Sequence, residues 1–219
     1  MRAPATLDNF KQQIKTSKIS IMKNASTLLR TLLGAGLILC SLNLASCKNE
    51  TKPDDSKEAA EEQNEAKFED TENKEDDSQY LVEAAETDLK EIEVGKLAQQ
   101  KGTDPQVKAF GKMLVDDHTK SSGEVKALAG RKNISLPLEV SDKGKEQYND
   151  LNQKSGADFD KKFADMMVDG HKKALDNAEK ASEKAADEEI RVWATNKIPT
   201  LTTHLQHAEA LKKAMDDKK

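Results

Sequence analysis

Two histidines recur in matching segments of the chain, and a third lies at the matching depth of a later helical segment. Phe110 precedes His118 by eight residues, and Phe163 precedes His171 by the same interval. Eight residues span a little over two turns of an α-helix, so each Phe and its His lie roughly on one side. Together with His204, they place imidazoles on the apolar faces of three predicted helices. Imidazoles that converge in a protein interior could bind a transition metal.

Glu91, on a fourth predicted helix, is the candidate for a fourth ligand. Imidazole and carboxylate groups from facing helices suit iron, zinc, copper or manganese. One hypothesis is therefore a site for one transition metal ion formed by Glu91, His118, His171 and His204. The alternative is a buried polar network, in which each histidine is hydrogen-bonded to a carboxylate or to a neighbouring histidine. The sequence leaves both interpretations open.

The spacing of the acidic residues argues against a dinuclear iron centre. Such centres in helical bundles use two Glu-x-x-His motifs and two further Glu, because two metal ions need bridging carboxylates. The residues three positions before the three histidines are Val115, Val168 and Leu201, and none is acidic. Any metal site is therefore expected to be mononuclear and rich in histidine. The adjacent acids Asp116 and Asp117 point to different faces of a helix and indicate solvated surface.

Signatures of common enzymes are missing from the sequence. It contains no Gly-rich phosphate loop, no His-Glu-x-x-His and no Gly-x-Ser-x-Gly motif, which favours a protein without catalytic activity. The net charge is −5, and no dense stripe of Lys and Arg with interleaved aromatic residues occurs. Nucleic acid is therefore not an expected partner. Protein partners stay open.

Composition and periodicity predict a helical domain. The 219 residues are 36% hydrophobic, 34% charged and only 4% aromatic, which is typical of helices with disordered flanks. Pro199 lies inside the last predicted helix and predicts a kink about one turn before His204. Apolar spacing and capping residues predict helices over 79–101, from 105 to a break at 133–137, over 157–186 and over 187–216, with a shorter helix after Ser141 that ends near Gly156.

Four amphipathic helices of this length have one economical arrangement, an antiparallel bundle. The longer link between the second and third helix carries the short extra helix, and it could let the second pair pack onto the first as in ferritin. The predicted fold class of residues 78–219 is therefore all-α: an antiparallel, ferritin-like four-helix bundle with one short helix in the central connection.

The N-terminal part of the chain has the features of a lipoprotein precursor. Residues 1–21 form no obvious element and are interpreted as an upstream extension, with Met22 as the truer start. Residues 22–46 have the pattern of a signal peptide, whose end, Leu-Ala-Ser before Cys47, resembles the bacterial lipobox. Cys47 is thus the predicted lipidation site, and its lipid would anchor the protein in a membrane. The alternative is an ordinary signal peptide followed by an incidental cysteine.

Residues 47–77 are predicted to be a disordered acidic tether. Residues 48–77 contain thirteen acidic and five basic residues, and Phe68 is the only large apolar one. So little apolar surface could be buried that ordering entropy would not be offset. Lys48 rather than Asp follows the cysteine, and by the usual bacterial sorting pattern this favours the outer membrane. The expected location is the cell envelope, as an outer-membrane lipoprotein on the periplasmic or the surface face.

Several segments of the predicted helical domain resemble one bacterial family. They are Glu-Ile-Glu-Val-Gly-Lys-Leu-Ala at 91–98 and the segments 113–118, 167–171 and 198–204. In order and spacing they are similar to the bacterial domain of unknown function 4142, a ferritin-like helical family often labelled as outer-membrane proteins. The resemblance covers about Ser78 to Met215. It implies a four-helix ferritin-like core, an envelope location and no established activity, with Glu91, His118, His171 and His204 as the polar signature.

Gly170 departs from the family pattern, which more often has Asp at this position. If that carboxylate orients His171, its loss weakens the support for His171 as a metal ligand. Two functions follow from the sequence. The leading one is a lipid-anchored, non-enzymatic envelope protein with a binding or stress-protection role, and the alternative is a mononuclear, histidine-rich metal-binding or redox protein.

Overall fold

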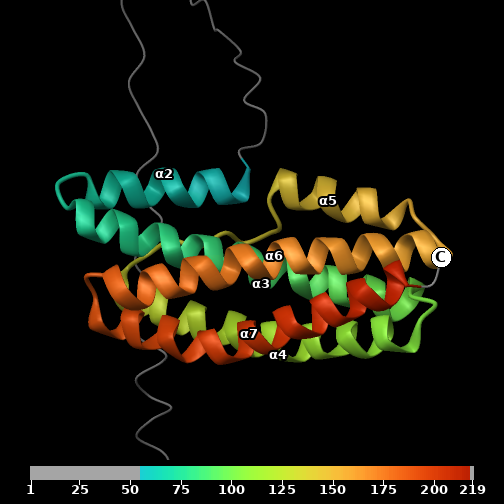
Figure 1. Ribbon diagram of the computed structural model, residues 1–219. Helices are drawn as coiled ribbons and strands as arrows, with labels where there is room; N and C mark the ends of the chain where they lie inside the picture. The colour runs from blue at the N-terminus through green and yellow to red at the C-terminus, as the bar shows by residue number, and fades with distance from the viewer. Residues whose placement is uncertain (1–54, 218–219) are drawn as a thin grey trace, which may run out of the picture. The chain divides into compact units, whose positions relative to one another are not determined.

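The computed structural model describes residues 55–217, and this part of the chain is helical without strands. The predicted all-α class is confirmed. The predictions for residues 1–21 and 22–46, and the lipidation site Cys47, lie outside the described residues. Among the described helices, none combines the length and the apolar composition that crossing a membrane would require. The helices are α2 (Ser56–Phe68), α3 (Glu72–Lys101), α4 (Pro105–Lys132), α5 (Asp142–Asn152), α6 (Gly156–Lys184) and α7 (Glu188–Asp216) (Figure 1).

The ends of the long helices follow local signals in the sequence. Asp104 caps α4 by accepting a hydrogen bond from the Gln106 amide at 2.7 Å, and Pro105 occupies the first turn, where its missing N–H is not needed. The helix ends at Asn133, whose φ of 57° is left-handed. Asp187 caps α7 in the same way as Asp104 caps α4. The helix α7 continues through Pro199, and the kink stays a prediction.

The predicted acidic tether is wrong over most of its length, because residues 56–68 form α2 and α3 begins at Glu72. Composition indicated disorder, but single long-range contacts order this segment. The buried Asn64 side chain exchanges two hydrogen bonds with the backbone of Ser135, at 2.9 and 2.7 Å. Lys57 lies between Glu61 and Glu83, at 2.8 and 2.9 Å. The first contact holds α2 to the segment between α4 and α5, and the ion pair with Glu83 holds it to α3.

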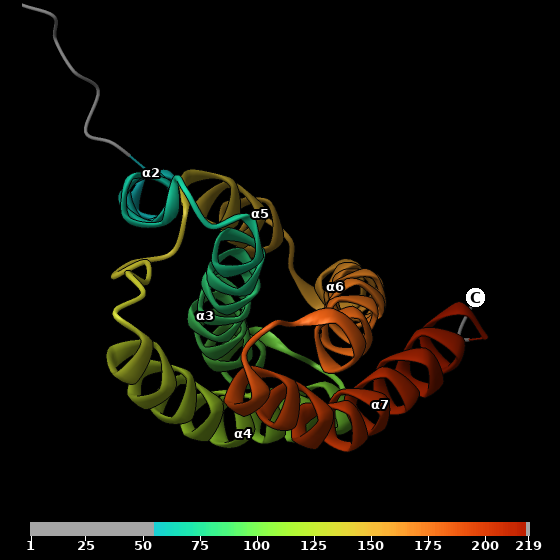
Figure 2. The same cartoon turned by 90° about the vertical axis from the view of Figure 1, so that its left-hand side faces the viewer.

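Two helical hairpins make up most of the described structure. A short loop at 102–104 joins α3 to α4, and one at 185–187 joins α6 to α7. The hairpins pack together through α3 against α6 and α4 against α7. Seen end-on, α2 and α5 lie on the side of α3 and α6 that faces away from α4 and α7 (Figure 2).

Each hairpin loop is held by an aspartate from the other hairpin. Asp160 of α6 accepts hydrogen bonds from the amides of Thr103 and Asp104, at 3.0 and 2.9 Å. Asp77 of α3 accepts from the amides at residues 186 and 187, at 2.9 and 2.8 Å. Both carboxylates are buried. The two loops are therefore fixed by reciprocal contacts between the hairpins.

Glycines allow α3 and α4 to approach closely. A Cβ atom at Gly95 would lie 2.7 Å from the carbonyl oxygen of Gly111, and a Cβ at Gly111 would lie 2.7 Å from the carbonyl oxygen of Gly95. Real Cβ atoms do not come that near to backbone. The close crossing of these two helices therefore requires glycine, which has no side chain, at both positions.

The apolar interior is divided into two clusters by a polar layer. One cluster contains Phe110, Phe159 and Phe163, and the other contains Leu81 and Ile190. Along each long helix buried polar residues separate the two clusters, and they include Glu91 on α3, His118 on α4, His171 on α6 and His204 on α7. The fold therefore brings the four predicted site residues to one level of the interior.

Candidate metal centre

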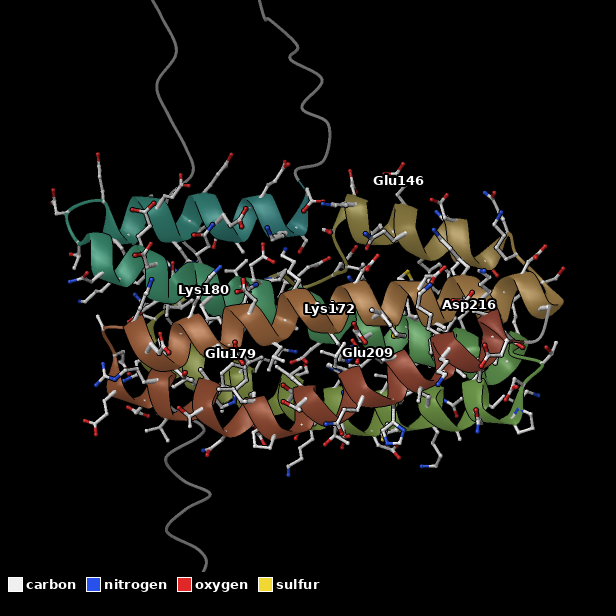
Figure 3. All side chains as sticks on the ribbon, viewed as in Figure 1. Glu146, Lys172, Glu179, Lys180, Glu209 and Asp216 are labelled. Atoms are coloured by element: carbon white, nitrogen blue, oxygen red, sulfur yellow. The ribbon has the colours of Figure 1, made fainter. Side chains whose placement is uncertain are left out.

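The four predicted ligands are buried and come from four different helices. The exposed fraction is 1% for Glu91, His171 and His204 and 4% for His118. This contrasts with the outer surface of the same helices, where charged side chains such as Lys172 and Glu209 pair across α6 and α7 at 3.6 Å (Figure 3). Burial of three imidazoles and a carboxylate at one level is costly unless these groups find partners.

The three imidazole rings face one another. Their centroids are 5.2 Å apart for His171 and His204, 5.5 Å for His118 and His204, and 6.0 Å for His118 and His171. One nitrogen from each ring lies within 4.8 Å of the others. Glu91 Oε2 lies 3.7 Å from Nε2 of His118 and also 3.7 Å from Nε2 of His171. The structure thus brings together all four residues that the sequence predicted.

The outer nitrogen of each ring has a hydrogen-bond acceptor. His118 Nδ1 lies 2.7 Å from Asp88 Oδ1, and His171 Nδ1 lies 2.9 Å from the carbonyl oxygen of Met167. His204 Nε2 lies 2.9 Å from Asp117 Oδ2. A carbonyl or carboxylate oxygen can only accept, so each of these nitrogens carries the hydrogen and donates it. Partners of this kind fix the tautomer and orientation of metal-binding histidines.

The inner nitrogens are consequently left with lone pairs that point at one another. His171 Nε2 and His204 Nδ1 are 3.2 Å apart, and with the ring hydrogens on the outer nitrogens no hydrogen lies between them. Among the described residues, His118 Nε2 and both oxygens of Glu91 have no hydrogen-bond partner. An arrangement of three lone pairs and a carboxylate requires a cation, which is either a shared proton or a metal ion.

Electrostatics keep the site ready for a cation. Burial lowers the pKa of His204 to about 4, with further lowering by the neighbouring rings, so this ring is neutral at pH 7 with its lone pair available. Burial opposes ionisation of Glu91, but His171 and His118 facing it hold its pKa below the usual value. Burial also opposes a charge on His118, yet the hydrogen bond to Asp88 and the charge of Glu91 raise its pKa. These two shifts favour a negative charge on Glu91 and a positive charge on His118.

The donor set fits one first-row transition metal ion. Imidazole nitrogen and carboxylate oxygen suit zinc, iron, manganese or copper. Bonds of about 2.0–2.1 Å to all three nitrogens need nitrogen separations of roughly 3–3.5 Å, and one nitrogen from each ring lies within 4.8 Å of the others. The pair His171 and His204, at 3.2 Å, already has this separation.

Two carboxylates that orient the rings were not predicted from the sequence. Asp88 lies one helical turn before Glu91, so it shares the inward face of α3. That spacing was the signal that could have identified it. Asp117 was interpreted as solvated surface, and this is corrected by the structure: its side chain is 44% exposed, yet it accepts the hydrogen bond from His204 across the contact between α4 and α7.

Gly170 does not leave His171 without support, since the Met167 carbonyl orients that ring. A Cβ at position 170 would lie 3.1 Å from Glu91 Oε1. A side chain at this position would therefore face Glu91 and not the outer nitrogen of His171. The concern raised by the departure from the family pattern is removed by this geometry.

Comparison with known proteins gives one family. Residues 57–211 match the family described as Domain of unknown function (DUF4142). No curated protein and no solved structure matches the chain. The matched range begins in α2 and ends in α7, so it includes every residue of the histidine site.

Proposed function

Because the chain belongs to the DUF4142 family, whose description assigns no activity, we propose its function from the site: the protein binds one transition metal ion through His118, His171, His204 and Glu91. The observation that carries the proposal is the contact of 3.2 Å between two ring nitrogens whose hydrogens are both committed to outer acceptors. A polar network without a cation would place a hydrogen between them.

The surroundings of the site support a single ion. One group of three histidines offers its nitrogens within 4.8 Å, and the described residues add no second such group of His, Cys, Asp or Glu. The pairing of α3 with α4 and of α6 with α7 through short loops supports a ferritin-like four-helix bundle as the frame. The absence of Glu-x-x-His motifs from the sequence supports a mononuclear site in that frame.

The experiment that tests this function is a measurement of metal content. Protein produced without a polyhistidine tag, stripped with a chelator and incubated with Mn²⁺, Fe²⁺, Co²⁺, Cu²⁺ or Zn²⁺, is expected to retain a single ion per chain after desalting. Calorimetric titration with the best-retained metal should give one site and, at low pH, release of protons, because a histidine must be deprotonated to bind the ion. Failure of all five metals to bind stoichiometrically would reject the proposal.

The second part of the proposal concerns location: Cys47 carries a lipid that anchors the protein in the cell envelope, on the outer membrane. It is supported by the lipobox-like Leu-Ala-Ser-Cys sequence at 44–47 that follows a short apolar segment. A role in stress protection for the metal site would agree with a location in the cell envelope.

We expect Cys47→Ala to abolish lipidation, because the thiol is the attachment point. Radiolabelled palmitate should enter the wild-type protein and not the variant, and the variant should accumulate as precursor or appear in the soluble fraction. Cys40→Ala, in the apolar run of the predicted signal peptide, is the matched control and should be lipidated normally. Equal membrane fractionation and no label in the wild type would contradict the anchor without affecting the metal site.

A further inference from the structure

A cavity of about 440 Å³ runs from the surface to the histidine site. All four long helices contribute to its lining. Its exposed lining residues include Lys120, Asn196 and Thr200, and its buried ones include His118 and His204. A cavity of this volume is in the range of small-molecule sites. It therefore connects solvent with two of the proposed metal ligands.

The cavity exists because two helices carry small side chains at its wall. Ala84 of α3 and Ala174 of α6 line it, and neither reaches far into the space between the helices. Tyr80 and Trp193 form another part of the wall, with their rings edge to face at 5.8 Å. The space is thus bounded by packed aromatic rings and is widened by the two alanines.

Most charges that line the cavity are already neutralised. Asp117 is bonded to His204, and Glu124 forms an ion pair with Lys197. Asp88 accepts the hydrogen bond from His118 with Oδ1. Its second oxygen, Oδ2, is buried and has no hydrogen-bond partner among the described residues. An occupant with an N–H or O–H group would satisfy this oxygen, whereas a simple anion would not.

The proposed metal ion would have room for such an occupant. The chain supplies three nitrogens and one carboxylate, so an ion that takes five or six ligands, such as iron or manganese, would keep a position for an exogenous molecule, whereas tetrahedral zinc would not. Since the cavity reaches His118 and His204, it offers a path to that position.

We propose that this cavity is the binding site of a small neutral molecule that coordinates the metal with a lone pair and donates an N–H or O–H group to Asp88. Hydrogen peroxide, hydroxylamine and azoles belong to this chemical class. The proposal rests on the metal-binding function proposed above. It makes the metal centre an open, reactive site and not a closed structural one.

The test uses the Co²⁺-loaded protein, because the visible absorption of Co²⁺ responds to a change of ligands. Titration with imidazole should change the spectrum saturably. 1-Methylimidazole has the same metal-binding lone pair but no N–H, and it is expected to bind at least ~10-fold more weakly, because a buried acceptor oxygen then stays unpaired. Equal affinity of the two compounds would overturn the role of Asp88.

Variants that fill the cavity test whether imidazole binds there. Ala84→Leu and Ala174→Leu are each expected to weaken imidazole binding by at least ~10-fold, since the added carbons occupy the pocket, while Co²⁺ binding stays stoichiometric. Val192→Leu, at a position that is 53% exposed and outside the cavity, is the matched control and should behave as wild type. A wild-type protein that binds Co²⁺ but does not respond to imidazole would reject this inference and leave the metal function standing. Absence of Co²⁺ binding would reject both.

Discussion

Replacement of His171 by leucine is expected to lower the affinity for the metal ion by more than ~100-fold. Loss of a hydrogen-bond partner behind a metal ligand already costs roughly 10- to 100-fold, and His171→Leu removes the ligand itself. Its Nε2 is the central donor of the site, 3.2 Å from His204 Nδ1 and 3.7 Å from Glu91 Oε2. Leucine keeps the buried volume approximately constant, so the fold should survive. The measurement is competition with a chromophoric chelator.

Although His171→Leu should lower metal affinity, it should not lower the stability of the metal-free protein. Without metal, the wild type buries three imidazoles and a carboxylate whose only cation is a shared proton, and an apolar side chain removes part of that cost. We expect metal-free His171→Leu to be as stable as the wild type or more stable, by about 1 kcal/mol, in urea denaturation. His207→Leu is the matched control, because His207 is exposed on α7 and its loss should leave metal affinity unchanged. If both variants bind metal like the wild type, the site lies elsewhere.

Gly111→Val is expected to reduce the free energy of unfolding by about 3 kcal/mol. A side chain at this position meets the Gly95 carbonyl oxygen at 2.7 Å and Ala98 Cβ at 2.8 Å, and backbone cannot move aside as a flexible side chain can. The contact between α3 and α4 must therefore open, which also separates Glu91 from His118. Urea denaturation followed by circular dichroism measures the effect, and metal affinity should fall in parallel.

A second glycine on the same helix gives a control of opposite sign. A Cβ at Gly123 would meet no atom within 4 Å, and the residue is exposed. Gly123→Ala should stabilise the protein by roughly 0.5–1 kcal/mol, since alanine loses less backbone entropy in a helix. Destabilisation by both substitutions would show that the loss at Gly111 is not specific to the close crossing of α3 and α4.

The helices could be predicted from the sequence because their ends carry local signals. Asp104 with Pro105, Gly102 and Ser141 each mark a boundary through groups only a few residues apart, and those boundaries are found in the structure. The ordering of α2 could not be predicted, because it depends on Asn64 meeting Ser135, 71 residues away. Average composition contains no information about one such contact.

The candidate site shows the same limit. The three histidines and Glu91 could be selected because helical periodicity places each on an apolar face, and all four are buried together. The role of Asp117 could not be predicted, because it depends on how far α4 and α7 are rotated toward each other. Periodicity tells which way a side chain points from its own helix, and it does not tell which residue of another helix it meets.

The reciprocal aspartates have a consequence for how the chain can be divided. A fragment that ends before α6 would contain the 102–104 turn without the carboxylate of Asp160, and the complementary fragment would contain the 185–187 turn without Asp77. Each fragment, produced separately, would contain one hairpin loop without the aspartate that accepts hydrogen bonds from it. Mixing the two fragments should restore both sets of hydrogen bonds together. The protein is therefore suited to split-fragment complementation, and metal binding by the mixture would show that the fragments have reassembled.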